Sequence, residues 1–256
     1  MTIVTFDIES LPDMRPGKRE AFIAASRANF KAPSSLTKEQ AAIDLGMTDP
    51  GEIKYTSKDS MLAKWVDRFR DEKADEVGDA EWRKTSFDGS RGMICVIGVA
   101  IMNRTPTSFW DEDYCQSEKG ILRSFFDFIE AHKEWSNFER LRFVGHNAAN
   151  FDARFIYQRA VINRVPVPLW WPHNARQWDS EVLFDTMTQW AGHNGRISLD
   201  DLCAALGIKG KTEGIDGSMV CAAVMDGRIA EVAAYCENDV AITREAFRRM
   251  TFQEEA

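Results

Sequence analysis

Blocks of apolar residues recur along this chain of 256 residues, and their spacing predicts an α/β protein. Short apolar runs bounded by turn-forming residues are typical of strands, whereas apolar residues three or four positions apart are typical of helices. Runs of the first kind lie at 2–8, 94–101, 108–110, 141–144 and 182–184. The run at 94–101 is apolar throughout, which indicates a strand covered on both faces. We therefore expect a central sheet flanked by helices.

Helices are expected between and after these strands. Side chains suited to cap the amino terminus of a helix stand at Ser117, Asn150, Ser198 and Asp216. A cap at Asn150 would place Asp152 in the first turn of its helix. The last helix is expected from about Ile229 to Met250, because an apolar stripe follows it at helical spacing.

Residues 13–90 break this alternation of strands and helices. The segment is rich in charges of both signs and reads as helical. Thr37 with Gln40 three positions later fits a capping box, and apolar residues from Met61 to Phe69 repeat at helical spacing. We expect a charged, mainly helical insertion after the first strand, within a single domain of residues 1–256.

The overall charge of −8 counts against a broad basic surface for nucleic acid. The charge is uneven, however, because arginines outnumber acids between Arg140 and Arg176, where Asp152 is the only acidic residue. Metal ions bound at acidic side chains would offset part of the negative charge as well. The composition is therefore compatible with a nucleic-acid substrate.

No feature of the sequence indicates a secreted or membrane protein. Five cysteines are scattered without a Cys-x-x-Cys pair, which argues against a zinc site and against a disulfide framework. The first residues lack the basic and apolar regions of a signal peptide. The longest apolar run, at 93–102, is about half as long as a bilayer-spanning helix. We expect a cytoplasmic protein with no membrane partner.

Acidic residues accompany three of the expected elements. Asp7 and Glu9 lie two positions apart on the first strand, so they project from the same face. Asp152 follows the strand at 141–144, and ligand sites in α/β sheets lie at the carboxyl ends of strands. Tyr235 and Asp239 are one helical turn apart, so they share a face of the last helix. Together these residues would supply oxygen ligands for Mg²⁺ or Mn²⁺, with a phenol beside them.

At these residues the chain resembles the DEDD (DnaQ-like) superfamily of 3′–5′ exonucleases. Asp7-Ile8-Glu9 matches the first motif, and His146-Asn147 through Phe151-Asp152 matches the second. Tyr235-Cys236-Glu237-Asn238-Asp239 matches the third motif in its tyrosine (DEDDy) form. The chain resembles the exonuclease domains of family B DNA polymerases and, in particular, the stand-alone proteins predicted as exonucleases related to those domains. The likeness covers residues 1–12 and about 85–250.

This resemblance implies a ribonuclease H-like fold, with a central mixed five-stranded sheet flanked by helices. It also implies a metal-dependent enzyme that hydrolyses phosphodiester bonds from the 3′ end of single-stranded DNA and releases nucleoside 5′-monophosphates. The expected cofactors are two divalent cations, Mg²⁺ or Mn²⁺. The implied metal ligands, which are also catalytic residues, are Asp7, Glu9, Asp152 and Asp239. Tyr235 would orient the attacking water, because a phenol with a pKa near 10 is a poor base at neutral pH.

The same resemblance suggests contacts with the substrate. The expected substrate-binding residues are Ser10, Leu11, Asn147, Phe151 and Lys211. Phe151 could stack on a base or could belong to the core. Lys209 beside Lys211 is as compatible with a solvated loop, and Trp170-Trp171 is better explained by packing than by stacking on a base. Asp185 could support the ligands without being one itself.

Three other functions remain open at this point. The chain could be a 3′–5′ exoribonuclease of the same fold, since discrimination depends on contacts with the 2′-hydroxyl. It could be a catalytically inactive ribonuclease H-like module that only binds nucleic acid, although all four carboxylates are present. A ribonuclease H-type endonuclease is disfavoured by Tyr235, four residues before Asp239. Likeness to polymerase domains favours single-stranded DNA over RNA.

Overall fold

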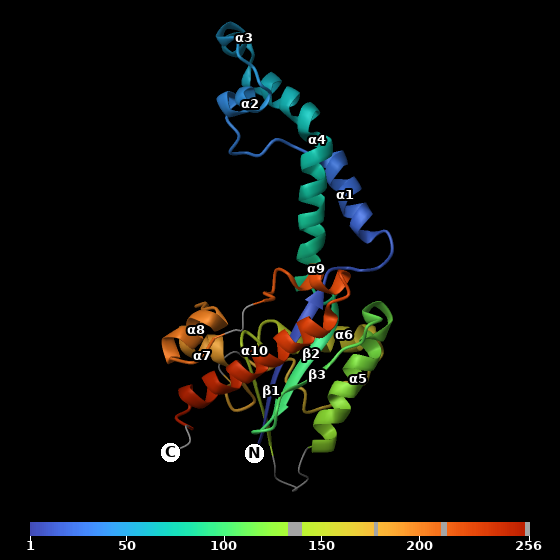
Figure 1. Ribbon diagram of the computed structural model, residues 1–256, viewed down its shortest axis with the longest axis vertical. Coiled ribbons are helices and arrows are strands. Elements are labelled where there is room, and N and C mark those ends of the chain that lie inside the picture. The colour runs from blue at the N-terminus through green and yellow to red at the C-terminus, as the bar shows by residue number, and fades with distance from the viewer. Residues whose placement is uncertain (133–139, 177–178, 211–213, 254–256) are drawn as a thin grey trace. The chain divides into compact units, whose positions relative to one another are not determined.

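Five strands form one mixed sheet in the computed structural model of this chain, which describes residues 1–132, 140–176, 179–210 and 214–253. The strands are β1 (Thr2–Leu11), β2 (Met93–Ile101), β3 (Thr107–Phe109), β4 (Leu141–Gly145) and β5 (Leu183–Asp185). Their order across the sheet is β3-β2-β1-β4-β5 (Figure 1). β1 pairs antiparallel with β2 and parallel with β4. The predicted mixed five-stranded sheet is confirmed.

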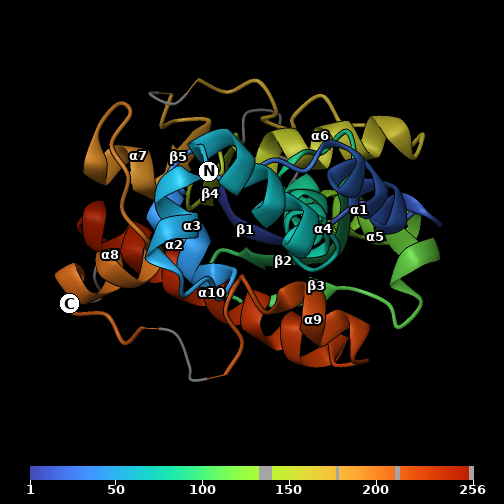
Figure 2. The same ribbon diagram turned by 90° about the horizontal axis from the view of Figure 1, so that it is seen from above.

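Helices cover both faces of this sheet. They are α5 (Tyr114–His132), α6 (Asp152–Ile162), α7 (Thr186–Ala191), α8 (Leu199–Leu206), α9 (Val220–Met225) and α10 (Ile229–Met250). Figure 2 shows α5 and α6 on one side of the sheet and α10 on the other. Alternation along β1 explains the layers, since Val4, Phe6 and Ile8 are buried in the cluster that includes residues of α5 and α6. Asp7 and Glu9 consequently face the side of α10.

Two of the predicted helix signals are confirmed. Ser198 caps α8, with its hydroxyl oxygen accepting a hydrogen bond from the Asp201 N–H at 3.0 Å. The last helix has the predicted bounds, Ile229–Met250.

Three predicted caps are wrong. Ser117 lies inside α5, which begins at Tyr114. Phe151, not Asn150, occupies the cap position of α6, although Asp152 is in the first turn as expected. α9 begins at Val220, because the Asp216 carboxylate accepts hydrogen bonds from the N–H and the hydroxyl of Ser218 and forms a local turn instead.

The chain divides into two compact units, Met1–Pro12 with Thr85–Ala256, and Asp13–Lys84. The second unit contains α1 (Lys18–Asn29), α2 (Lys38–Asp44), α3 (Pro50–Tyr55) and α4 (Lys58–Arg83), and the short 3-10 helix η1 (Lys84–Phe87) follows. Thr37 caps α2 through the Gln40 N–H, as the capping pattern predicts. That this unit is an insertion within a single exonuclease domain stays a prediction.

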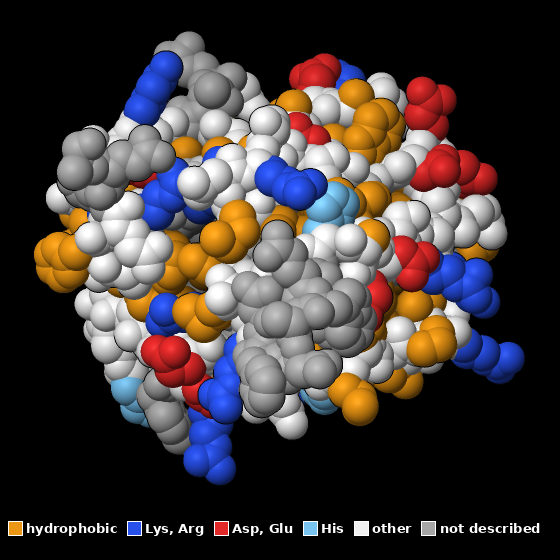
Figure 3. All heavy atoms as spheres, turned by 90° about the horizontal axis from the view of Figure 1, so that it is seen from below, with side chains coloured by type: hydrophobic (Ala, Val, Ile, Leu, Met, Phe, Trp, Pro, Cys, Tyr) orange, Lys and Arg blue, Asp and Glu red, His pale blue; other side chains and the backbone are white. Residues whose placement is uncertain are grey.

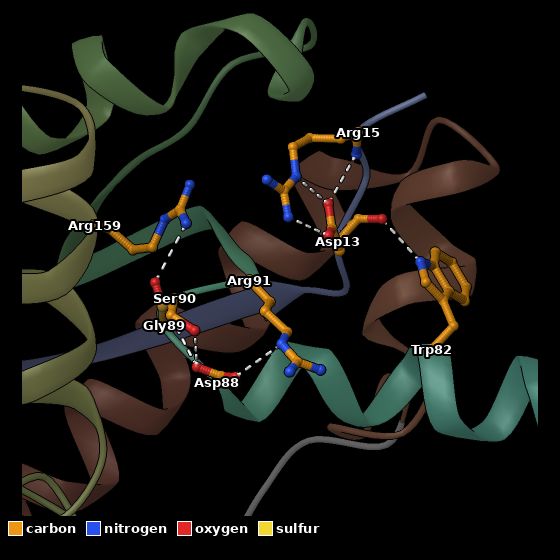
Figure 4. Close-up of polar contacts among 8 residues, drawn as sticks. All are labelled: Asp13, Arg15, Trp82, Asp88, Gly89, Ser90, Arg91 and Arg159. Atoms are coloured by element: carbon orange, nitrogen blue, oxygen red, sulfur yellow. Dashed lines mark hydrogen bonds and ion pairs between the residues drawn. The ribbon is translucent and has the colours of Figure 1, made fainter. Parts of the chain in front are cut away.

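A small apolar cluster stabilises the second unit. Trp65 and Met61 on α4 are buried against Ala41 and Ala42 of α2, and the Trp65 ring also contacts Phe69. At the other end of α4, the Trp82 indole N–H donates to the Asp13 carbonyl oxygen at 2.8 Å, as Figure 4 shows. Burial of these large rings gives a 72-residue segment a core of its own.

The surface is mixed in charge where it can be seen in Figure 3. On that face, basic and acidic side chains are interspersed with apolar ones. This face therefore carries no broad basic footprint of the kind that binds nucleic acid by charge alone. Among the described residues, no helix is both long enough and apolar enough to cross a membrane.

Candidate active site

Four carboxylates from three separate parts of the sequence gather around β1. Oxygens of Asp7 and Glu9 and the sulfur of Cys236 all lie within 4.8 Å of one another. Asp152 lies next to them, because its Oδ1 accepts a hydrogen bond from the Ile8 N–H at 3.3 Å. The charge of Asp239 acts on Asp7 together with those of Asp152 and Glu9. The structure thus brings together all four residues that the sequence predicts as metal ligands.

A glycine on β2 lets α10 approach the sheet closely enough to deliver its side chains. Gly98 stands opposite Asp7 in the antiparallel pairing of β1 and β2. A Cβ at Gly98 would lie 2.8 Å from the sulfur of Cys236 and 3.0 Å from the side chain of Val240. Figure 1 shows α10 running across the strands at this level. The absence of a side chain at Gly98 therefore sets the distance between Asp7 and the Tyr235–Asp239 turn of α10.

The electrostatics of Asp7 favour a bound cation. Burial is the largest cause of a pKa for Asp7 well above its usual range. The carboxylates of Asp152, Glu9 and Asp239 raise that pKa further, in that order. A group that is costly to ionise in this setting is stabilised as a carboxylate when a divalent ion offsets the shared negative charge.

The donor set also indicates which kind of metal fits. The Cys236 thiol is buried, and burial together with the charge of Asp7 raises its pKa well above the ordinary value. The thiol therefore stays protonated and donates to Asp7 Oδ2 at 3.5 Å rather than acting as a thiolate ligand. Carboxylate oxygens remain as the available donors, and they suit Mg²⁺ or Mn²⁺.

Tyr235 lies against the carboxylates on the same face of α10. Its hydroxyl forms a hydrogen bond with the side chain of Asp239, one helical turn away. Burial raises the pKa of Tyr235 far above its ordinary value, and the charges of Asp239, Glu9 and Asp7 add to the shift. The phenol consequently keeps its proton across the physiological pH range.

A cleft of about 900 Å³ opens beside this cluster. Its lining residues come from β1, the loop after β4, α7, the segment that joins α7 to α8, the start of α8, and α10: Asp7, His146, Asn147, Asn150, Phe151, Met187, Thr188, Asn194, Gly195, Arg196, Ile197, Ser198, Leu199, Asp201 and Asp239. Two of the clustered carboxylates, Asp7 and Asp239, are thus part of the cleft wall. The predicted substrate-binding residues Asn147 and Phe151 line the same cleft.

A buried carboxylate holds the loop that carries Asn147. Asp185 is fully buried and caps α7, with Oδ1 accepting from the Met187 and Thr188 N–H groups. The same side chain accepts from the Asn147 N–H at 3.0 Å and from the Ala149 N–H at 2.9 Å. Four N–H donors compensate the burial of its charge. Asp185 therefore fixes the loop at the end of β4, where Asn147 adopts a left-handed backbone with φ of 59°.

Phe151 belongs both to the core and to the cleft. It is half-buried, packs against Phe155 with ring centroids 5.2 Å apart, and lines the cleft with its remaining surface. The ring of Phe87 lies 6.3 Å from that of Phe151 and is 73% exposed. Phe87 is the last residue of the short 3-10 helix η1, and no apolar periodicity in the sequence points to it.

Hydrogen bonds fix the segment that carries Phe87, and Figure 4 shows those made by Asp88 and Gly89, which follow it. The Ser10 hydroxyl at the end of β1 donates to the Ser86 carbonyl oxygen at 2.8 Å. The Asp88 carboxylate closes the turn by accepting from the N–H of Ser90 at 2.9 Å. Arg159 donates to the Gly89 carbonyl oxygen at 3.3 Å. The exposed ring of Phe87 is therefore presented on an ordered backbone.

The remaining predicted residues occupy different places. Leu11 is fully buried, which leaves it no surface for a nucleotide, and the Ser10 hydroxyl is engaged by Ser86. Trp171 is buried in the main core, as the packing interpretation of Trp170-Trp171 predicts. Lys211 lies outside the residues that the structure describes.

Comparison with known proteins supports the fold and identifies the family. Residues 93–255, more than half of the chain, match the family described as "Predicted 3'-5' exonuclease related to the exonuclease domain of PolB". No curated protein is similar enough to the chain to count as a match. The match begins at Met93, so Asp7 and Glu9 lie before it, and the structure is what joins them to the matched residues Asp152 and Asp239.

A solved structure shares the fold. The chain is similar to the family B DNA polymerase from the hyperthermophilic archaeon Pyrobaculum calidifontis, with a TM-score of 0.51 and 14% sequence identity. The similarity covers 98% of this chain and 24% of the polymerase chain, so the chain spans about a quarter of that polymerase. At this identity the likeness is one of fold. The family match, in contrast, extends over most of the sequence, and the chain belongs to the family of predicted 3′–5′ exonucleases related to the exonuclease domain of PolB.

Proposed function

We propose that this chain is a metal-dependent 3′–5′ exonuclease of the DEDDy type. In this proposal it hydrolyses phosphodiester bonds from the 3′ end of single-stranded DNA and releases nucleoside 5′-monophosphates. The observation that carries the proposal is the gathering of Asp7 with the carboxylates of Glu9, Asp152 and Asp239 at the wall of a 900 Å³ cleft. The relation of the family to an exonuclease domain of PolB supports DNA rather than RNA as the substrate.

The metal ligands in this proposal are Asp7, Glu9, Asp152 and Asp239, with two Mg²⁺ or Mn²⁺ ions as cofactors. Bound there, such ions lower the pKa of water and stabilise the charge that develops on the leaving oxygen. The fold of the chain holds the carboxylates in place. The thiol of Cys236 and the N–H of Ile8 each donate to one of the carboxylates, which restricts Asp7 and Asp152 to defined positions.

Tyr235 acts as an orienting residue in this mechanism. Because its hydroxyl donates to Asp239, its lone pairs point away from that carboxylate and can accept a hydrogen bond from the attacking water. Its raised pKa excludes a role as a general base at neutral pH. The phenol therefore holds the water in line with the phosphorus and leaves its activation to the metal site.

Substrate contacts follow from the cleft. Asn147 can hydrogen-bond the bound strand from a loop that Asp185 holds in place. The exposed surfaces of Phe151 and Phe87 form a neighbouring pair of rings on which bases can stack. Stacking on aromatic rings tolerates every base, which suits an enzyme that shortens strands without regard to sequence.

The buried carboxylates predict that the metal-free protein loses stability as the pH rises. Burial is the largest cause that raises the pKa of Asp152, to about 7, and the charge of Asp185 contributes. The folded state therefore binds the Asp152 proton more tightly than the unfolded state does. The contribution of this proton to the free energy of unfolding is fully present below about pH 4 and is lost as the pH rises through about 7. For Asp152 alone the loss amounts to at most about 4 kcal/mol.

We expect the thermal midpoint in EDTA to fall between about pH 5.5 and pH 8, and Mn²⁺ to raise it more at the higher pH. Asp152→Asn removes the titrating group, so its midpoint in EDTA should fall less over the same range. Scanning calorimetry of both proteins measures the difference. A variant whose midpoint falls as steeply as that of the wild type would contradict this origin of the pH dependence.

The function is tested with oligonucleotides blocked at one end. The purified protein is incubated with matched DNA and RNA strands, each blocked at the 3′ or the 5′ terminus, in Mg²⁺, Mn²⁺ or EDTA. We expect nucleoside 5′-monophosphates from DNA with a free 3′ end in either metal, and no products in EDTA. Faster digestion of RNA would favour an exoribonuclease, and cleavage of a circular strand would indicate an endonuclease.

A further inference from the structure

Part of the cleft wall is formed by residues of the segment 192–198 between α7 and α8. Asn194, Gly195, Arg196, Ile197 and Ser198 all line the cleft. Figure 1 shows α7 and α8 near the carboxyl-terminal end of α10. We call residues 192–198 the wall segment. It lies outside the three acidic motifs at Asp7–Glu9, His146–Asp152 and Tyr235–Asp239.

Among the cleft-lining residues that the structure describes, Arg196 is the only lysine or arginine. The other charged side chains of the lining are the carboxylates of Asp7, Asp201 and Asp239. The Arg196 side chain is exposed, and within the described part of the chain it forms no ion pair. A guanidinium without an acidic partner, in a cleft that otherwise carries negative charge, is available to an anionic ligand.

The backbone that carries Arg196 is held at several points. Gly192 has φ of 79° and accepts a hydrogen bond from the Gly195 N–H at 3.1 Å, which forms a turn at one end of the wall segment. A Cβ at Gly195 would lie 2.2 Å from the Ala191 carbonyl oxygen, so the turn requires a glycine there. At the other end Ser198 is fixed as the cap of α8. The wall segment therefore presents Arg196 from an ordered position.

His146 connects the wall segment to the end of β4. One ring nitrogen, Nε2, lies 3.0 Å from the Ile197 carbonyl oxygen, to which it can only donate. The other, Nδ1, lies 2.9 Å from the hydroxyl oxygen of Thr186 at the start of α7. This histidine, which stands in the second sequence motif, thus spans two elements around the cleft. Its bond to Ile197 fixes the residue adjacent to Arg196.

We propose that the wall segment is a phosphate-binding site of the cleft, in which Arg196 binds a backbone phosphate of the substrate strand and His146 positions Arg196 through the Ile197 carbonyl. The identity of the strand rests on the proposed function. A guanidinium binds a phosphate with two parallel hydrogen bonds, which a lysine cannot reproduce. The contact is made to the sugar-phosphate backbone, so it adds affinity for any base sequence.

The test compares Arg196→Ala with the wild type in steady-state exonuclease assays over a series of KCl concentrations. Loss of one charge-assisted contact should raise KM about tenfold and leave kcat within about twofold. The plot of log(kcat/KM) against log[KCl] should become shallower by about 0.7, the value for one phosphate contact on a single strand. Arg196→Lys should restore the slope and only part of KM, because the charge remains and the paired geometry is lost.

Arg123→Ala is the matched control, since Arg123 is an exposed arginine on α5 that does not line the cleft. It removes the same charge and should leave both KM and the salt slope at the wild-type values. If Arg196→Ala also keeps the wild-type KM and slope, the phosphate site is wrong.

The role of His146 is tested by a double-mutant cycle. His146→Ala should raise KM in the wild-type background and add little in the Arg196→Ala background, because it acts through Arg196. His146→Gln keeps a donor for the Ile197 carbonyl, so its KM should stay near the wild-type value. This variant also tests the positioning role if His146→Ala does not fold. Additive effects of the two alanine substitutions would overturn the positioning role.

Binding measurements separate this inference from the proposed function. Fluorescence anisotropy of a labelled oligodeoxythymidylate with the full chain is measured in EDTA, where the strand is not cut, so it reports the affinity for the intact strand. Weaker binding by Arg196→Ala, by at least about fivefold, supports the phosphate site even if the wild type releases no nucleotides. Equal dissociation constants for the two proteins overturn it, and absence of nucleotide release by the wild type overturns only the exonuclease proposal.

Discussion

Replacing Asp7 with asparagine is expected to lower the rate of mononucleotide release by on the order of a thousandfold or more, with the fold intact. Asparagine has almost the same shape as aspartate, so the packing of β1 against α10 is retained. The substitution removes the negative charge that is surrounded by Glu9, Asp152 and Asp239, and with it the central ligand of the proposed metal site. The measurement is the single-turnover rate on a 3′-labelled single strand at saturating protein.

The folded state of this variant should be at least as stable as the wild type in EDTA. The pKa of Asp7 is raised well above its ordinary range, which means that its ionised form is unfavourable in the metal-free fold, and asparagine cannot ionise. In the wild type Mn²⁺ should raise the thermal midpoint, and in Asp7→Asn this increase should largely disappear.

Asp127→Asn provides the matched control, because Asp127 is an exposed acid on α5, away from the cleft. It should keep the wild-type rate and the wild-type response to Mn²⁺. An Asp7→Asn protein that cuts at the wild-type rate would exclude Asp7 as a metal ligand and, with it, the proposed mechanism.

Local signals in the sequence were sufficient for the sheet and for the acidic cluster. The strand at β1 and the helix at α10 each carry a periodic apolar pattern, and periodicity is a property of a short window of sequence. Asp7 and Glu9 share a face because the period of a strand is two, and Tyr235 meets Asp239 because a helix turns every 3.6 residues. Once these elements were assigned, the position of the site followed from the carboxyl ends of strands.

Contacts that depend on tertiary packing could not be read in the same way. Cys236 reads as one more apolar position of α10, yet its sulfur donates to Asp7, because Gly98 allows the helix to come that close. Asp216 is of a residue type that often caps helices, but its carboxylate accepts a hydrogen bond from the Ser218 N–H within its own turn. Cys236 is placed by a partner distant in sequence, whereas Asp216 has two local alternatives, a helix cap and a turn, between which its residue type does not decide.

The roles proposed for Arg196 and His146 in the cleft could not be predicted from any sequence motif. Arg196 lies in a segment without apolar periodicity, and the hydrogen bond from His146 to Ile197 ties that segment to the end of β4. A histidine beside a strand end has several common roles, among them metal binding and structural hydrogen bonding. The contact with Ile197 selects the structural role in this fold. The wall segment can therefore be recognised only from the tertiary structure.

Replacing Tyr235 with phenylalanine is expected to lower kcat by about a hundredfold and to leave KM nearly unchanged. The ring is buried and phenylalanine keeps its packing, so the substitution removes only the hydroxyl that contacts Asp239. In the proposed mechanism that hydroxyl orients the water and does not hold the substrate, so its loss should affect the rate of the chemical step. The measurement is kcat and KM on single-stranded DNA in Mg²⁺, with Tyr157→Phe as a control that removes a hydroxyl from a ring stacked on His173.

The pH dependence distinguishes an orienting phenol from a general base. Because burial and three carboxylates hold the pKa of Tyr235 far above its ordinary value, an orienting tyrosine predicts no change in the shape of the kcat profile up to about pH 9 when it becomes phenylalanine. A tyrosine that accepted the proton from water would instead contribute an ascending limb that the variant lacks. A parallel pair of profiles, offset by about a hundredfold, supports orientation. Loss of an ascending limb in Tyr235→Phe would require a charged phenolate beside Asp239, which the burial of this cluster opposes.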